Sequence, residues 1–167
     1  MKLITTIFVY FAILSNSFSQ DDWIKTWDKN YPEAKLVDIC NNEKKYADKI
    51  EAQIIESQYY SRIDKYRIKG KYLGKTKPIE KSIISSMKRV YKLFVGKSEV
   101  LEKDVKHQMQ FEVEGFNIWI PVQEVLIKSF EEEIEIGTEV TLYCLFLNEH
   151  TSEKELYNHF LISEFHQ

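Results

Sequence analysis

Apolar and polar residues alternate along the last third of the chain, in the pattern of β-strands that bury one face. Residues 108–114 alternate strictly, and Glu114-Gly115 marks a turn directly after them. A second strand is expected over Phe116–Ile120, and Pro121 closes it. The pattern therefore predicts two consecutive strands in this region.

One helix and two further strands complete this β-rich region. Val122–Phe130 carries its apolar residues on one helical face, which predicts a short amphipathic helix. Val140–Leu147 is apolar on both faces, so we expect a central strand that is covered on both sides. A last strand is expected over Leu156–Phe165. Short strands with one inserted helix favour a small antiparallel β-barrel, OB-like or SH3-like.

The residues that precede this region favour helices. Trp23 and Trp27 are four residues apart and would share one face of a first short helix. Pro32 interrupts that helix and suits the first turn of a second one, which is expected to run to Cys40. Two short helices are therefore predicted at the start of the folded chain.

Two longer helices are predicted next. From Glu43 the apolar residues recur at steps of three and four, and Gly70 is a natural stop. From Gln58 onward the same residues could instead form a strand. Pro78–Phe94 shows a clear apolar stripe. Joined by a short loop, the two helices would form an antiparallel helical hairpin packed on the barrel, so the expected fold class is α+β.

Residues 1–19 are predicted to be a signal peptide. Leu3–Leu14 is a nearly continuous apolar run, and Ser17 and Ser19 fit the small residues required before a cleavage site at Gln20. The run is short for a permanent membrane span, although an uncleaved anchor is the alternative. No later stretch is apolar enough to cross a membrane, so we expect an extracytoplasmic protein, periplasmic or secreted.

The domain organisation follows from these elements. We expect a signal peptide over 1–19, a helical region over 20–97 and a small β-barrel-like domain over 98–167. With 44% hydrophobic and 29% charged residues, the composition is that of a globular protein and disfavours disorder.

Three stretches of the β-rich region carry a resemblance. Asn117–Gln123, Gly137–Tyr143 and Phe160–Phe165 resemble the C-terminal β-domain of uncharacterised secreted proteins of Bacteroidetes-type bacteria. The resemblance covers less than half of the chain and its motifs are structural. It implies a fold and no activity, and it assigns a function to no residue.

Charge is distributed very unevenly along the chain. Residues 58–97 contain twelve Lys and Arg against two acidic residues, whereas residues 98–167 contain four Lys against fifteen acidic residues. Such asymmetry can mark a surface for an anionic partner. The alternative is that the basic part lies against the acidic part, so that the two fields largely cancel. Because the barrel is the acidic part, the sequence disfavours nucleic acid as a partner.

The leading functional hypothesis is a non-enzymatic binding or interaction protein. Its partner would be an unknown protein or an anionic envelope component, such as lipopolysaccharide or anionic lipid, held on a basic, tyrosine-rich helical face. The barrel face near a tryptophan is the second candidate surface, although that ring could instead pack under a helix. The candidate binding residues are Tyr59, Tyr66, Lys88, Arg89, Lys92 and Trp119.

No motif in the sequence dictates a catalytic chemistry, and the sequence implies no cofactor and no metal site. The alternative function is a small extracytoplasmic hydrolase or metal-dependent enzyme with its site near residues 148–155. That site would need His150, His159 and a carboxylate such as Glu149 or Glu153, a spacing that matches no known ligand motif.

Two cysteines, Cys40 and Cys144, leave a structural question open. In an oxidising compartment they could form a disulfide, but spacing alone cannot bring two distant positions within bonding reach. Cys144 lies among apolar residues, where a thiol is buried and unreactive. Both a disulfide and two free thiols are consistent with the sequence.

Overall fold

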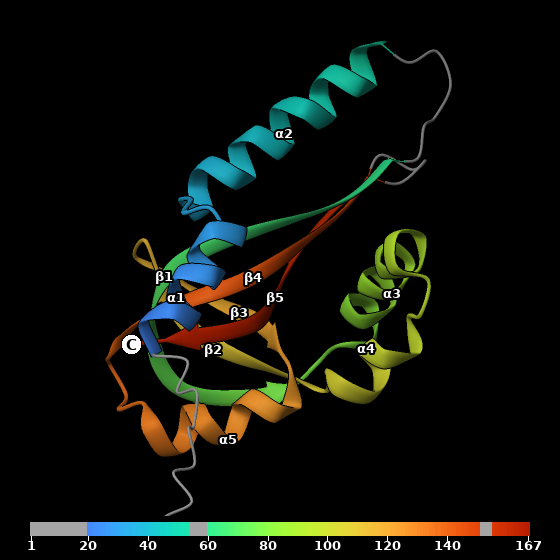
Figure 1. Cartoon of the computed structure of the whole chain (residues 1–167). Helices are drawn as coiled ribbons and strands as arrows, with labels where there is room; N and C mark the ends of the chain where they lie inside the picture. The colour runs from blue at the N-terminus through green and yellow to red at the C-terminus, as the bar shows by residue number, and fades with distance from the viewer. Residues whose placement is uncertain (1–19, 54–59, 151–154) are drawn as a thin grey trace, which may run out of the picture.

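The computed structural model describes residues 20–53, 60–150 and 155–167 and has a mixed α+β architecture (Figure 1). The α+β class predicted from the sequence is confirmed. Residues 1–19, expected to be a signal peptide, lie outside the described residues. The elements in chain order are α1 Gln20–Asn30, α2 Leu36–Gln53, β1 Tyr60–Pro78, α3 Lys81–Val95, α4 Glu99–Asp104, β2 His107–Val113, β3 Phe116–Val122, α5 Glu124–Glu133, β4 Glu139–His150 and β5 Leu156–His166.

The five strands close into a ring in the order β1-β2-β3-β5-β4 (Figure 1). β1 pairs antiparallel with both β2 and β4, so the first strand joins the two halves of the ring. β3 and β5 run parallel and meet at a single pair, Val122 opposite Ile162. On the β1 side the ring therefore has long antiparallel ladders. On the opposite side β3 and β5 share one backbone pair, and the side-chain amide of Gln123 donates to the carbonyls of Ile162 and Ser163.

β1 serves two neighbours because it bends sharply. Over its 19 residues it follows β4 from Tyr60 to Lys71 and β2 from Lys71 to Pro78. Gly70 lies at the changeover and is buried; a Cβ there would stand 3.2 Å from side-chain atoms of both Leu142 and Val113. Such contacts are tighter than ordinary packing, so a side chain at Gly70 would push these neighbours aside.

Alternate residues of the strands fill the ring, and α5 closes one end of it. Phe130 of α5 stacks on Phe165 of β5 with ring centroids 3.8 Å apart, and it also contacts the rings of Tyr72 and Phe111. All four rings belong to one core cluster of buried residues. Aromatic stacking of this kind adds to the free energy gained by burying the rings, and it fixes where α5 sits.

β4 is covered on both faces, as its two-sided apolar pattern predicts. Its inward residues fill the ring. On the outer face, Tyr143 packs against Trp23 and Trp27, which share one face of α1. Further along, Leu147 packs in a second buried cluster with residues of α3. Helices on the outside and the ring interior on the inside therefore provide the two covers.

The strands expected over 108–114, Phe116–Ile120, Val140–Leu147 and Leu156–Phe165 are confirmed as β2, β3, β4 and β5. The inserted helix is confirmed as α5, which begins two residues later and ends three residues later than expected. Pro121 does not close the preceding strand, because β3 continues through it to Val122.

The predicted helical hairpin is wrong. The helix is described as far as Gln53, and residues 60–78 form β1, the strand that the sequence allowed as the alternative from Gln58 onward. Tyr66, Ile68 and Tyr72 fit a period of two as well as a helical stripe. Tyr66 and Ile68 pair with β4, and Tyr72 pairs with β2. The first short helix, with Trp23 and Trp27 on one face, is confirmed as α1. The second, expected to end at Cys40, is revised, because α2 begins at Leu36 and continues through Cys40 without a break.

We predict that Gly70→Val lowers the free energy of unfolding by about 1–3 kcal/mol, because the ring cannot close around the added side chain without displacing Leu142 and Val113. Urea denaturation followed by circular dichroism measures the change. Lys69→Val, at the neighbouring exposed position of the same strand, is the control and should stay within about 0.5 kcal/mol of the parent. Equal effects of the two variants would contradict this explanation of ring closure.

Candidate functional site

α3 lies on the outer face of β4 and β5, in the connection between β1 and β2 (Figure 1). Its buried residues Met87 and Val90 lie on one helical face and pack against Leu147 and Leu161 of these strands. Gly96 ends the helix in the left-handed conformation, with φ 86°, and its N–H donates to the carbonyl of Lys92 at 3.1 Å. The chain therefore turns sharply into α4.

Two of the predicted binding cations form ion pairs within the fold. Lys88 pairs with Glu102 of α4 at 2.6 Å. Arg89 donates twice to the carboxylate of Glu149, both at 2.7 Å, and the hydroxyl of Ser86 donates to it at 2.7 Å. Glu149 is completely buried, so Arg89 is needed to compensate its charge.

The same pairing of basic with acidic segments recurs on β1. Lys69 pairs with Glu139 at 3.7 Å, and Lys71 pairs with Glu112 at 3.3 Å. Together with the ion pairs of Lys88 and Arg89, these contacts show that part of the basic segment lies against the acidic segment. This arrangement is the alternative to a free basic face that the sequence left open. Lys92, by contrast, is an exposed residue of the last turn of α3.

Exposed apolar side chains follow Lys92 along the chain, where α3 turns into α4. Leu93, Phe94 and Val95 are 60%, 55% and 52% exposed, and Val100 on α4 is 44% exposed. Contiguous exposed apolar residues mark contact surfaces more often than scattered ones do. We refer to Lys92, Leu93, Phe94, Val95, Lys97 and Val100 as the α3 corner.

The remaining predicted binding residues do not join the α3 corner. Tyr66 lies on β1 and packs against Phe146 with ring centroids 5.9 Å apart, in contact with the core of the ring. Trp119 lies on β3, where the ammonium group of Lys77 stands 4.8 Å above its ring. Tyr59 lies outside the described residues. The predicted tyrosine-rich basic face is therefore divided among different elements.

The histidines of the alternative enzyme site lie on opposite faces of the β4–β5 ladder. His150 bonds to Glu51 of α2 at 2.8 Å. His159 stands opposite Leu147, whose side chain faces α3, and successive residues of a strand point to alternate faces. Glu153 lies outside the described residues. Within the described ranges, no three potential metal ligands gather at one place.

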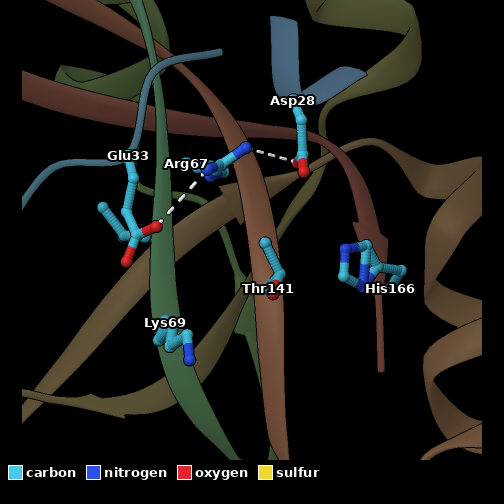
Figure 2. Close-up of a pocket in the computed structure, with 7 residues that line it drawn as sticks. Asp28, Glu33, Arg67, Lys69, Thr141 and His166 are labelled. Carbon is cyan, nitrogen blue, oxygen red and sulfur yellow. Dashed lines mark hydrogen bonds and ion pairs between the residues drawn. The ribbon is translucent and has the colours of Figure 1, made fainter. Parts of the chain in front are cut away.

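A pocket of about 160 Å³ lies where α1 meets β1 and β4 (Figure 2). Arg67 of β1 reaches across it and pairs with Asp28 of α1 at 2.6 Å and with Glu33 at 3.4 Å. The hydroxyl of Tyr143 donates to the same Asp28 carboxylate at 2.8 Å, and burial is the main reason that the pKa of Tyr143 lies well above its ordinary value. The contacts of Asp28 with Arg67 and Tyr143 hold α1 against the ring. The sequence did not reveal this pocket, because the pattern around Arg67 favours a helix and leaves a strand only as the alternative.

Both cysteines are free thiols. Cys40 is exposed on α2, whereas Cys144 is buried inside the ring. Burial raises the pKa of Cys144 far above its ordinary value, which keeps the thiol protonated and unreactive. The structure therefore answers the question that the sequence left open in favour of two separate thiols.

No protein-family model matches this chain, and neither a curated protein nor a solved structure does. The resemblance to secreted Bacteroidetes-type proteins therefore stays a prediction. Within the described ranges, no helix has both the length and the apolar character needed to cross a bilayer.

We predict that Arg89→Ala lowers the free energy of unfolding by about 2–3 kcal/mol, because it removes the guanidinium that pairs with the buried Glu149 carboxylate. Urea denaturation measures the loss. Lys92→Ala, three residues later on the same helix, should change it by less than about 0.5 kcal/mol. Adding Glu149→Gln to Arg89→Ala should restore part of the stability; no restoration would show that the uncompensated charge is not the cause.

We predict that native protein exposes one reactive thiol and unfolded protein two. Cys40 should react with an aromatic disulfide reagent, more slowly than free cysteine because burial raises the pKa of this thiol. Absorbance of the released thiolate counts the groups before and after denaturant is added. Cys40→Ser should abolish the native reaction. If denatured, unreduced protein showed no thiol, the two cysteines would be paired.

Proposed function

We propose that this chain is an exported, non-enzymatic binding protein that attaches to an anionic lipid surface through the α3 corner. Export rests on the leader pattern of residues 1–19. One observation carries the binding proposal: the last residues of α3 are exposed and apolar, and the rest of this helix contains basic residues but no acidic residue. Anionic lipid is one of the envelope components that the charge distribution of the sequence favours.

We assign the ring to the OB type rather than the SH3-like type. The strand order β1-β2-β3-β5-β4, the parallel β3–β5 pair and the helix between β3 and β4 support this assignment. OB-type domains serve mainly as binding modules, and their ligands lie on strands two and three and on the loops that flank them. The α3 corner belongs to the connection between β1 and β2, which is one of these loops.

The chemistry of the α3 corner suits the boundary between water and lipid. α3 carries Lys81, Lys88, Arg89 and Lys92, and its sequence contains neither aspartate nor glutamate. A lysine close to an anionic membrane contributes roughly 1 kcal/mol of attraction, and buried apolar side chains add to it. Lys88 and Arg89 already pair with carboxylates of the same chain. We therefore expect weak, reversible attachment to the lipid surface that depends mainly on Lys92 and Lys97.

The enzyme alternative has less support. It required His150 and His159 to converge with a carboxylate around a pocket, and these imidazoles face opposite sides of the ladder. The barrel face near Trp119 is the second binding candidate. There the ammonium of Lys77 already occupies one side of the ring, which limits stacking by a ligand on that side.

We predict that purified protein cosediments with vesicles that contain phosphatidylglycerol and not with vesicles of phosphatidylcholine alone. Binding should weaken as salt is raised, because lipid charges are screened over about 10 Å at 0.1 M ionic strength. The double variant Leu93→Ser/Phe94→Ser and the single variant Lys92→Glu should each weaken binding by roughly tenfold or more. Cosedimentation across a salt series measures these changes.

Val125→Ser is the matched control, since Val125 is 77% exposed on α5 and lies outside the α3 corner. It should bind vesicles as the parent does. Absence of vesicle binding at low salt would overturn the proposal. Binding that depends on Lys92 but ignores Leu93 and Phe94 would also contradict it, and would indicate an acidic protein as the partner.

A further inference from the structure

A cleft lies beside α2, which is anchored at both ends. Figure 1 shows that α2 rises beside the extended part of β1. At its start, the backbone N–H groups of Leu36 and Val37 donate to the carboxylate of Glu114 at 2.8 and 3.2 Å. Near its far end, Glu51 bonds to His150 of β4 at 2.8 Å. Between these anchors the cleft encloses about 480 Å³. Small-molecule sites usually enclose about 300–1,000 Å³, so this cleft is large enough for a ligand.

The cleft is polar, with aromatic rings on its walls. α2 and the segment before it form one side, and β1 forms the other. Three carboxylates face two cations, and two tyrosine rings lie among them. The charged and aromatic residues that line it include Lys35, Asp38, Glu43, Tyr46, Arg62 and Tyr66.

Glu43 is the unusual residue of this cleft. The buried side of α2 is defined by Leu36, Ile39, Glu43 and Ala47, so a carboxylate occupies a position where the helical pattern calls for an apolar residue. Glu43 is only 2% exposed. Its Oε1 pairs with the guanidinium of Arg62, while its Oε2 has no hydrogen-bond partner among the described residues. A buried oxygen without a donor costs folding free energy, which a ligand with donor groups would recover.

Two buried residues on the side of β4 that faces α2 repeat this feature. Asn148 donates to Asn158 at 2.6 Å, yet its own carbonyl oxygen has no partner in the described part of the chain. His150 bonds to Glu51 through Nε2, and its Nδ1 has no hydrogen-bond partner among the described residues. The space between α2 and the sheet therefore holds further buried polar atoms that have no hydrogen-bond partner among the described residues.

The mixed charge of the cleft selects against charged ligands. Arg62 and Lys35 would repel a cation, and Asp38, Glu43 and Glu33 would repel an anion. A neutral ligand meets neither penalty. Hydroxyl groups donate to a carboxylate and accept from a guanidinium at the same time, and the apolar face of a sugar ring can pack on Tyr46 or Tyr66. These properties together describe a neutral saccharide.

We infer that the cleft between α2 and β1 binds a neutral saccharide, with Glu43 accepting a hydroxyl hydrogen bond and Tyr46 packing against the sugar ring. This site differs from the α3 corner and depends on none of its residues. The protein would then hold a sugar on one side while another surface contacts its partner.

The test is a titration of ¹⁵N-labelled full-length protein with maltotriose, cellotriose and chitotriose, with spermidine as a cationic probe. We expect at least one trisaccharide to shift backbone signals of α2 and of β1 near Arg62. Glu43→Gln and Tyr46→Ala should each weaken that binding about tenfold or more. Lys44→Ala, an exposed residue of α2 outside the lining of the cleft, is the matched control and should bind as the parent does.

Tyr46 is 42% exposed, so Tyr46→Ala should fold and keeps the test decisive even if Glu43→Gln does not fold. Absence of shifts with all three sugars at about 10 mM would overturn the inference, since that excludes binding of even millimolar affinity. Shifts with spermidine and none with sugars would overturn it too. Variants of the α3 corner should leave sugar binding unchanged, so failure of the lipid proposal and failure of this one are separable.

Discussion

Closure of the strand ring depends on the bend of β1 at Gly70. One strand supplies the partner for β4 along its first part and for β2 along its last part, so the ring exists only if the chain can turn between them. The turn brings β1 so close to Leu142 and Val113 that a side chain at Gly70 would have to displace them. Everything outside the ring is placed relative to this bend: α1 and α3 lie on the outer face of β4, and α2 rises beside the extended part of β1 (Figure 1).

Local patterns predicted the later strands well, because each was unambiguous on its own. The alternation over 108–114 and the two-sided apolar run over Val140–Leu147 have no comparable helical interpretation. The helix favoured for residues 60–78 was wrong for the opposite reason: its pattern was ambiguous. Tyr66 and Ile68 fit either period, and what decides between helix and strand is the partner edge of β4, about eighty positions later in the chain. Gly70 was taken as a helix stop, since close packing at a glycine leaves no mark in a single sequence.

For the candidate surfaces, composition predicts which residue types gather in a segment, but only the fold shows which of their side chains are free to bind a partner. The sequence indicated that lysine and arginine gather in the segment around α3. It could not tell that Arg89 holds a buried carboxylate while Lys92, one turn away, faces solvent. Nor could it place Glu43 against Arg62, because their pairing follows from β1 being a strand. The clefts of this protein lie between elements that meet only in the fold.

The Glu114 contact with the start of α2 has a consequence for the order of folding. Glu114 lies in the turn between β2 and β3 with φ 51°, a conformation that is costly for a residue other than glycine. Its carboxylate satisfies the N–H group of Leu36, 78 positions earlier in the chain. That helix start can be satisfied in this way only after the β2–β3 hairpin has formed. α2 is therefore synthesised before the residue that satisfies its first N–H groups, and this contact forms only once the β2–β3 hairpin is in place.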